Sequence, residues 1–345
     1  MEYRVPEYIM TIKQIVFPKQ NKVVCQETEA DFSLGVNDIA IKTHYSLVSA
    51  GTELAKLTGL QKVKYPFIPG NRAVGEVIET GAGVKKFDVG DMIFTHSPHV
   101  SHAKATKFCA RISDNIDLCY ASLVGLGLVA MTAIRVGQPE LGDKVVITGM
   151  GVVGNLCAQL LNASGVDVIG VDVIQSRLDL AKKCGIMNII NPRTQDIRSA
   201  VMDLTDGHGA EYVIEATGNP PIIETACAVV AKQGQIILLG SPRGEYQTDV
   251  TPLLNSVHLW KDQGSIQLKG AHEWRYPMYD NGYAKHSMIR NADIFFRMLA
   301  QEKINVGDII THIVEPQQAE EAFFGLLNNK DKYLGVVFDW TNQEQ

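Results

Sequence analysis

Six residues, Gly149-Met150-Gly151-Val152-Val153-Gly154, form a G-x-G-x-x-G pattern between a short apolar run and a segment with helical periodicity. In that context, each glycine has a mechanical role: a tight turn, close approach of the backbone to a pyrophosphate, and close packing of helix on strand. The N-terminus of the following helix offers free N–H groups and the positive end of a dipole. The pattern therefore predicts a dinucleotide-phosphate site made by Gly149, Gly151, Val152, Val153 and Gly154.

An acidic residue, Asp172, ends the next apolar run, eighteen positions after Gly154. A carboxylate there accepts hydrogen bonds from the adenosine ribose hydroxyls and repels a 2′-phosphate, which favours NAD(H) over NADP(H). Arg177 follows five residues later and could face the adenine or a phosphate. The alternative is a structural glycine turn followed by an ordinary strand-end aspartate.

The elements that must position these residues are short Val- and Ile-rich runs alternating with helical patterns, as in a parallel sheet covered on both faces. We expect strands at 144–148, 166–172, 212–216 and 235–240, and a helix between the first two that is closed by Gly165. This pattern predicts an α/β fold with a Rossmann doubly wound parallel sheet. The expected cofactor site is completed by residues at or beyond the strand ends: Ala216, Thr217, Leu239, Gly240 and Ala271.

The first 125 residues differ, because apolar runs there are broken by glycine turns such as Ile68-Pro69-Gly70 and Val89-Gly90-Asp91. This composition is typical of a mainly β domain. Helical patterns at 292–300 and 317–327 and a strand at 335–339 close the chain, and we expect them to pack back on this domain. The predicted division is 1–126 with 271–345, and 127–270.

Bulk properties limit the partners. The 345 residues carry a formal net charge of -6, so no basic face is available for a nucleic acid. Nowhere do about eighteen apolar residues follow one another, as a membrane span or a secretory signal would require, so we expect a cytoplasmic protein. The six cysteines are scattered singly, without the close pairs of a structural zinc site or a disulfide framework, so we expect most of them to be buried thiols.

The order of these elements resembles the medium-chain dehydrogenase/reductase superfamily, in which a GroES-like β domain precedes a Rossmann domain. The residues that carry the resemblance are the nucleotide loop together with 49–53 (Ser-Ala-Gly-Thr-Glu), 69–77, 89–91 and 335–340. The Ser-Ala-Gly-Thr-Glu motif resembles a zinc-type alcohol dehydrogenase-like branch, similar to sugar and polyol dehydrogenases. The resemblance implies hydride transfer between NAD(H) and a small secondary alcohol or ketone, such as a sugar or polyol.

The positions that hold catalytic zinc in the superfamily carry other residues in this chain. Ala50-Gly51-Thr52-Glu53 stands in place of Cys-Gly-Thr-Asp, Gly70-Asn71-Arg72 in place of Gly-His-Glu, and Val124 to Leu126 contains no ligand. Because zinc needs three protein ligands even in an open site, we expect none. The alternative is a relocated site built from His96, His99 and His102, although Pro98 disfavours a helical arrangement of them.

Without zinc, another group must take the alcohol proton. His99, in a loop that the resemblance places near the substrate, is the predicted general acid/base, against a structural role. Thr52 occupies the position of the hydroxyl that relays the substrate proton in the superfamily. Glu53 and Arg72 are expected to form a salt bridge in the emptied metal pocket, or Arg72 stabilises an oxyanion.

His272 and Trp274 follow the last expected strand and are candidate substrate contacts, the alternative being hinge packing. Two other functions stay open: a metal-free quinone or enoyl reductase, and a non-catalytic NAD(H)-binding protein. The expected partners are a small-molecule alcohol or carbonyl substrate and further copies of the chain in a homodimer or homotetramer. The segment Ser265 to Lys269 is the expected pairing edge.

Overall fold

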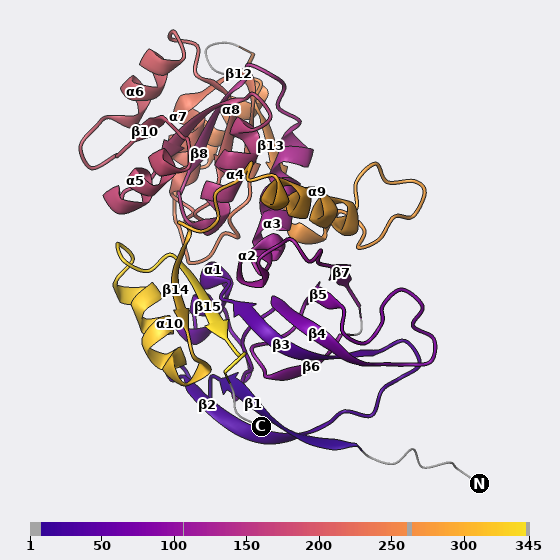
Figure 1. Ribbon diagram of the computed structural model, residues 1–345. Coiled ribbons are helices and arrows are strands. Elements are labelled where there is room, and N and C mark those ends of the chain that lie inside the picture. The colour runs from indigo at the N-terminus through magenta and orange to yellow at the C-terminus, as the bar shows by residue number, and fades with distance from the viewer. Residues whose placement is uncertain (1–7, 106, 261–263, 343–345) are drawn as a thin grey trace. The chain divides into compact units, whose positions relative to one another are not determined.

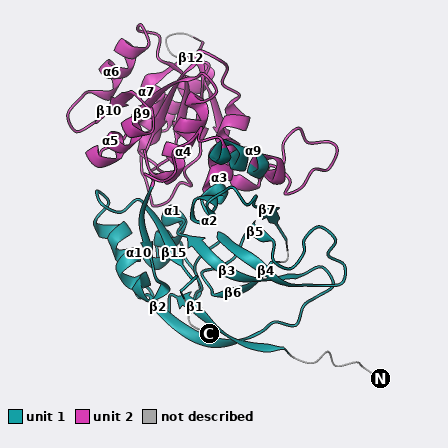
Figure 2. Cartoon of the chain, in the orientation of Figure 1, with its two compact units in different colours: residues 1–125, 292–300, 310–345 teal, residues 126–291, 301–309 magenta. Residues whose placement is uncertain are grey.

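The computed structural model describes residues 8–105, 107–260 and 264–342, and these divide into two compact units (Figures 1 and 2). Unit 1 contains residues 1–125, 292–300 and 310–345, and unit 2 contains 126–291 and 301–309. The first boundary falls one residue from the expected one. Residues 271–291 and 301–309 belong to unit 2, in contrast to the expected division.

Unit 2 is built on a six-stranded parallel sheet in the order β10-β9-β8-β11-β12-β13, the strand order 3-2-1-4-5-6 of a Rossmann fold. Its strands are rich in Val and Ile because both faces of the sheet are covered by helices. They are β8 (Lys144–Thr148), β9 (Asp167–Val171), β10 (Asn188–Ile190), β11 (Ala210–Glu215), β12 (Val230–Leu238) and β13 (Gln267–Gly270).

The helices of unit 2 follow these strands in alternation. α4 begins at the expected position, with Gly151 as its N-cap, and Gly165 has the left-handed φ of 79° expected beyond its end. The helices that lie between or after the strands are α4 (Val152–Asn162), α5 (Gln175–Lys183), α6 (Ile197–Leu204), α7 (Ile222–Val229), α8 (Thr251–His258) and the short 3-10 helix η1 (Glu273–Arg275). Helix α3 (Val124–Gly137) precedes the sheet, and α9 (Met288–Ala300) follows it.

Unit 1 is mainly β, as expected for the N-terminal half, and its larger sheet runs β14-β15-β3-β4-β5-β7 with β6 also on β3. A separate ribbon pairs β1 (Ile9–Val16) with β2 (Val24–Asp31). The other strands are β3 (Ile39–Leu47), β4 (Ala73–Thr80), β5 (Met92–Thr95), β6 (His102–Ala105), β7 (Cys109–Arg111), β14 (Ile310–Val314) and β15 (Gly335–Asp339). The predicted α/β fold with a parallel sheet and a second, mainly β unit is therefore confirmed.

The C-terminal segment of the chain completes the core of unit 1. β15 pairs antiparallel with β3, and Trp340 N–H donates to His44 O at 2.9 Å. Phe323 of α10 (Ala319–Asn328) and Phe338 join Phe17 in one buried cluster, with the rings of Phe17 and Phe323 edge-on at 5.1 Å. This cluster also receives one face of α1 (Ala50–Leu57), the helix that carries Thr52 and Glu53; the remaining helix, α2 (Leu118–Ala121), is short.

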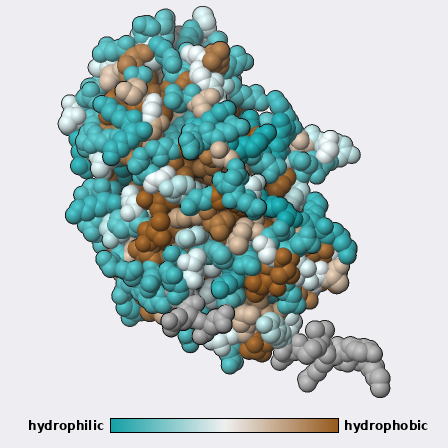
Figure 3. Space-filling view, in the orientation of Figure 1, coloured by the Kyte–Doolittle hydropathy of each residue, from teal (hydrophilic) through white to brown (hydrophobic). Residues whose placement is uncertain are grey.

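Hydrophilic residues cover most of the face shown in Figure 3. Within residues 8–105, 107–260 and 264–342, no helix is long and apolar enough to cross a membrane. The six cysteines are free thiols, three buried and three half-buried. Burial raises the pKa of Cys157 to about 12 and that of Cys109 to about 11.

Candidate functional site

The glycine loop of unit 2 has the geometry that its sequence predicts. Gly149 adopts a left-handed φ of 91°, which L side chains rarely do. A Cβ on Gly154 would lie 1.8 Å from Gly149 O, so only glycine permits this contact of helix with loop. A Cβ on Gly151 would meet nothing within 4 Å, which leaves open space at the start of α4 for a ligand. Val152 and Val153 form the first helical turn, whose N–H groups have no acceptor within the helix.

Asp172 closes this loop from the neighbouring strand. Its Oδ2 accepts from Met150 N–H at 2.8 Å and its Oδ1 accepts from Ile174 N–H at 2.9 Å. Arg177 Nη1 lies 3.7 Å from Oδ2. A carboxylate has about four lone-pair sites, so each oxygen retains one for a ribose hydroxyl. The buried side chain of Asp172 therefore positions the loop and keeps an acceptor for a sugar.

The other predicted cofactor residues gather at the same edge of the sheet, where β8, β11, β12 and β13 end. Ala216 N–H donates to Thr148 O at 2.9 Å, and Thr217 Cγ2 lies 2.7 Å from the position a Gly149 Cβ would take. Leu239 and Gly240 both donate to Glu215 O, and Ala271 donates to Leu238 O. Ligands of open α/β sheets bind at this edge, where the strand order reverses between β8 and β11.

Glu215 is a residue of this edge that the sequence analysis missed. Its buried carboxylate accepts from Thr217 N–H at 2.7 Å and from Gly218 N–H at 3.0 Å, and also from the Thr217 hydroxyl. Burial raises the pKa of Glu215, and these hydrogen bonds oppose that rise. The signal available was an acidic residue that ends an otherwise apolar strand. Glu215 holds the loop in which Thr217 is presented.

In unit 1, four predicted or neighbouring residues form a buried hydrogen-bonded chain. His99 Nε2 lies 2.9 Å from Glu53 Oε2, and His99 Nδ1 lies 2.8 Å from Ser46 Oγ. Trp340 Nε1–H donates to Ser46 Oγ at 2.9 Å. Because indole only donates, one arrangement satisfies every group: Ser46 O–H donates to Nδ1, and Nε2–H donates to Glu53.

The position of His99 does not fit the expected general acid/base. Its side chain is 0% exposed, both ring nitrogens are engaged, and its ring packs edge-on against Phe338 at 5.0 Å. A group that exchanges protons with a substrate must reach it directly or through one water. The loop at 96–100 faces the core of unit 1 because His99 N–H is held by Pro69 O and His99 O by Ile15 N–H. His99 thus has a structural environment.

The expected Glu53–Arg72 salt bridge is replaced by the pair of Glu53 with His99. The second carboxylate oxygen, Oε1, accepts from Ser49 N–H at 2.7 Å at the start of α1. These bonds place α1, and with it the neighbouring Thr52, whose own N–H donates to Ser49 O at 3.0 Å. Glu53 therefore positions the helix that carries the predicted proton-relay hydroxyl.

Arg72 stands at one of the positions where the resemblance leads one to expect a metal ligand. It is 2% exposed, and a Cβ on Gly125 would lie 2.6 Å from its Cδ and 2.9 Å from its Nε. Gly125 belongs to 124–126, the segment where a third metal ligand would be expected. The positively charged guanidinium of Arg72 therefore lies directly beside that segment. Together with Ala50 and Asn71, this arrangement does not fit a zinc site of the usual kind.

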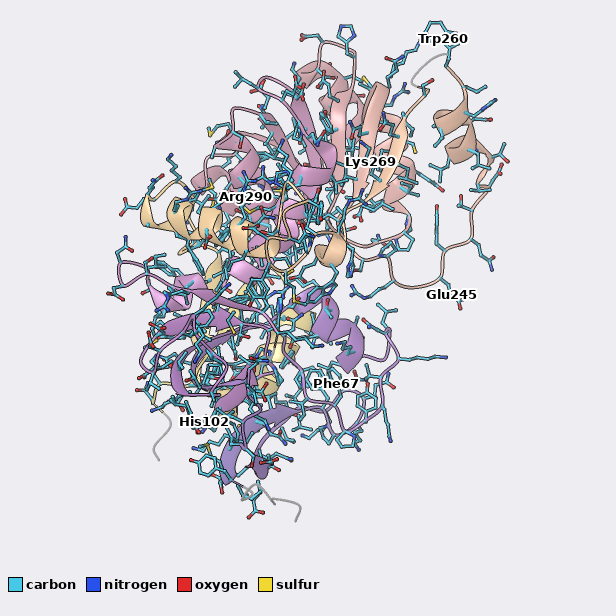
Figure 4. The ribbon with its side chains drawn as sticks, turned by 90° about the vertical axis from the view of Figure 1, so that its right-hand side faces the viewer. Phe67, His102, Glu245, Trp260, Lys269 and Arg290 are labelled. Carbon is cyan, nitrogen blue, oxygen red and sulfur yellow. The ribbon has the colours of Figure 1, made fainter. Side chains whose placement is uncertain are left out.

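The three histidines of the alternative metal site have separate surroundings. His96 packs against Phe94 and Phe108, and His102, labelled in Figure 4, bonds Ser101 Oγ through Nδ1 at 3.1 Å. No group of three or more His, Cys, Asp or Glu in the described ranges could hold a metal ion. The geometry gives the relocated site no support.

The two candidate substrate residues lie in unit 2. His272 caps η1, where its Nδ1 accepts from Trp274 N–H at 3.4 Å, and the Trp274 side chain is half exposed. An exposed indole at this place is compatible with a substrate contact. The role of both residues stays a prediction.

Comparison with known proteins agrees with this architecture. Residues 35–138 match the alcohol dehydrogenase GroES-like domain, and residues 152–279 match the zinc-binding dehydrogenase family. An uncharacterized zinc-type alcohol dehydrogenase-like protein of Haemophilus influenzae is 26% identical over 94% of this chain and 98% of its own. L-threonine 3-dehydrogenase of Pyrococcus furiosus is 29% identical over 76% of this chain and 79% of its own.

The crystal structure of galactitol-1-phosphate dehydrogenase from Escherichia coli matches with a TM-score of 0.82 at 16% identity, over 95% of this chain and 99% of that one. Both halves of the chain thus match the same class of protein, an oxidoreductase with a GroES-like and a nucleotide-binding part. The chain is therefore similar to zinc-type alcohol dehydrogenase-like proteins in both of its parts.

The buried Glu53–His99 pair generates a stability prediction. His99→Ala leaves the Glu53 carboxylate buried with one partner fewer, and we expect a loss of about 3–5 kcal/mol in the free energy of unfolding. Adding Glu53→Gln to that variant should recover part of the loss, because the buried charge is gone. Urea unfolding followed by tryptophan fluorescence measures this, since Trp340 is the buried tryptophan of the described chain.

The control is His102→Ala, a nearby half-buried histidine, for which we expect a loss below about 1 kcal/mol. Equal losses for the two histidine variants, or strictly additive effects of His99→Ala and Glu53→Gln, would contradict the coupled pair.

Proposed function

We propose that the protein is an NAD(H)-dependent dehydrogenase that acts on a secondary alcohol or its ketone, a sugar or polyol by class, without catalytic zinc. The observation that carries the proposal is Asp172, a buried carboxylate bonded to Met150 of the glycine loop and to Ile174. Bound nicotinamide would supply the centre that accepts or donates the hydride. The relatives support the reaction class, because L-threonine 3-dehydrogenase and galactitol-1-phosphate dehydrogenase are named for hydroxylated substrates.

The preference for NAD(H) rests on the charge at the end of β9. A 2′-phosphate would bring at least one negative charge to the Asp172 carboxylate, whereas a 2′-hydroxyl would donate to it. Arg177 at 3.7 Å from Oδ2 partly compensates the carboxylate and limits the expected discrimination. The open space at Gly151 and the first turn of α4 would receive the pyrophosphate.

Wild-type protein should bind NADH more tightly than NADPH in a fluorescence titration. Asp172→Asn removes the charge and one of the two acceptor oxygens, so we expect NADH to bind about tenfold more weakly, equivalent to about 1.4 kcal/mol, with a smaller effect on NADPH. The matched control is Asp167→Asn, an exposed aspartate at the opposite end of the same strand, which should change neither affinity. Tighter binding of NADPH by the wild type would reverse the assignment.

The proposed proton path uses Thr52 in place of a metal. Thr52 lies on α1 beside Glu53, and the contacts of Glu53 with His99 and Ser49 fix that helix. Arg72, buried against Gly125, supplies a fixed positive charge in the same unit where the superfamily has ligands. In this proposal the alcohol gives its proton to the half-buried Thr52 hydroxyl, which passes its own proton to solvent as the hydride leaves. The buried charge of Arg72 favours the developing oxyanion through its field and without contact, and His99 and Glu53 act as positioning residues.

Thr52→Val keeps the side-chain shape and removes the hydroxyl, and we expect kcat on a panel of sugars, polyols and their ketones to fall about 10²- to 10⁴-fold. Thr52→Ser should recover most of that loss, and NADH affinity should stay constant in both variants. Dialysis against a strong zinc chelator should leave the wild-type rate unchanged.

Four outcomes would overturn parts of this proposal. Chelator-sensitive activity restored by zinc would contradict metal independence, and full activity of Thr52→Val would contradict the relay. NADH binding without turnover across the panel would favour the non-catalytic alternative, for which the replaced ligand positions are the supporting observation. Reduction of quinones or enones alone would favour the reductase.

We also propose that two copies pair along β13, which is the edge strand of the unit 2 sheet. Apolar side chains lie exposed on and near it, with Leu268 42% and Trp260 71% exposed, and Figure 4 shows Trp260 and Lys269 on this side of the unit. An isologous edge-to-edge contact would cover these side chains.

Light scattering should give at least twice the 37.9 kDa mass of one chain. Leu268→Asp should lower that mass toward the single chain because it places charges on the paired edge. Met187→Asp, an equally apolar exposed site beside the opposite edge strand β10, should not. A wild-type mass of one chain would contradict the pairing.

A further inference from the structure

A second polar cluster in unit 2 lies apart from the dinucleotide edge, at the start of α9. The loop of residues 277–287 closes on itself there, since Met288 N–H donates to Pro277 O at 2.8 Å and Ile289 N–H to Met278 O at 2.9 Å. Ser287 begins the helix, and its Oγ accepts from Arg290 N–H at 3.2 Å. This closure fixes Lys285, His286 and Arg290 at one helix end, and Figure 4 shows Arg290 on α9.

A third cation, Arg135, belongs to another element. Arg135 lies in the last turn of α3, close enough to Arg290 for the two charges to repel. Burial lowers the pKa of His286, and the positive charges of Arg135, Arg290 and Lys285 lower it further. Burial also lowers the pKa of Arg135, with Arg290 adding to the effect and Tyr276 opposing it. Three cationic side chains and a histidine whose charged form is disfavoured therefore share one region.

The cluster holds polar atoms that the described part of the chain does not satisfy. His286 is 7% exposed, its ring is edge-on to Tyr276 at 5.6 Å, and its buried Nδ1 has no hydrogen-bond partner among the described residues. The buried Nε of Arg135 also has no hydrogen-bond partner among the described residues. Unsatisfied buried polar atoms cost about 1–3 kcal/mol each, so an arrangement that retains them calls for a function.

The neighbouring acidic group, Asp280, forms no ion pair with Arg135 or Arg290 in the described ranges. Asp280, in the same loop, accepts from the Ser287 hydroxyl through Oδ1. Over the described ranges, no ion pair joins Arg135 or Arg290 to a carboxylate. Like charges gathered without a counter-charge oppose folding unless an anion joins them.

We propose that Arg135, His286 and Arg290 form a binding site for a phosphate group. A phosphate offers several acceptor oxygens to guanidinium forks, and it would raise the pKa of His286 so that both ring nitrogens donate. The N-terminal end of the 13-residue helix α9 adds favourable potential for an anion. Lys285 and Arg290 are exposed and can meet a ligand from solvent, while His286 is buried.

This site uses elements different from those of the proposed dinucleotide site, namely the end of α3 and the start of α9. Its ligand is either free phosphate or the phosphate group of a small metabolite. The proposal does not depend on whether Asp172 selects NAD(H). Such a site would let the protein respond to a phosphate compound that is not its cofactor.

The test is isothermal titration of the full-length protein with inorganic phosphate at constant ionic strength, with chloride as the reference anion. Phosphate should bind the wild type, and Arg135→Gln should weaken binding about tenfold or more, since a charge-assisted hydrogen bond contributes about 1.5–3 kcal/mol. The matched control, Arg297→Gln, neutralises an exposed arginine at the other end of α9 and should bind phosphate as the wild type does. Without phosphate, Arg135→Gln should unfold at the same or a higher temperature, because the repulsion is relieved.

Titration with glycerol phosphate distinguishes the two ligand sources: tighter binding of the ester indicates a phosphorylated metabolite, and tighter binding of phosphate indicates the free anion. Phosphate that binds no better than chloride would overturn the proposal. So would equal phosphate affinity of the wild type and Arg135→Gln, which would locate the anion elsewhere, for example at the glycine loop.

Discussion

The cofactor half of the protein depends on one carboxylate that joins two strand ends. Asp172, at the end of β9, accepts from Met150 N–H in the loop that follows β8. This bond fixes a backbone that only glycines at 149 and 154 permit, because one has a left-handed φ and the other touches the carbonyl of the first. The remaining residues of the site follow from the strand order, since β11, β12 and β13 end at the same edge.

The other half depends on a different buried contact. Glu53, His99, Ser46 and Trp340 come from α1, the 96–100 loop, β3 and the end of the chain, and they meet in a region without solvent. Breaking this chain leaves a charge or an indole N–H unsatisfied, so it commits the C-terminal segment to unit 1. Helix α1 is therefore held by polar contacts on one side and by the aromatic cluster of Phe17, Phe323 and Phe338 on another.

Local patterns in the sequence predicted the Rossmann sheet, the glycine loop and Asp172, because each is determined by residues within about thirty positions of one another. The partner of His99 could not be predicted in this way. Its contacts lie at positions 46, 53 and 340, and no spacing rule connects residues so far apart. His99 was therefore assigned to proton exchange from its loop position, whereas the structure buries it.

The same reason explains two further differences. The sequence predicts a salt bridge of Arg72 with Glu53 in the emptied metal pocket, but Glu53 pairs with His99 and the side chain of Arg72 lies beside Gly125. Arg135 and His286 are separated by about 150 residues and were not singled out, since an isolated arginine or histidine carries no pattern. Long-range packing decides which polar residues meet, and only the folded chain shows it.

The most direct test of the account is a crystal structure with NADH bound, measured with X-rays on both sides of the zinc absorption edge. The account predicts ribose hydroxyls of the adenosine on Asp172, pyrophosphate at Gly151 and the start of α4, and no zinc signal beside Ala50, Asn71 and Arg72. A zinc peak at that place, or a dinucleotide whose ribose does not contact Asp172, would contradict it.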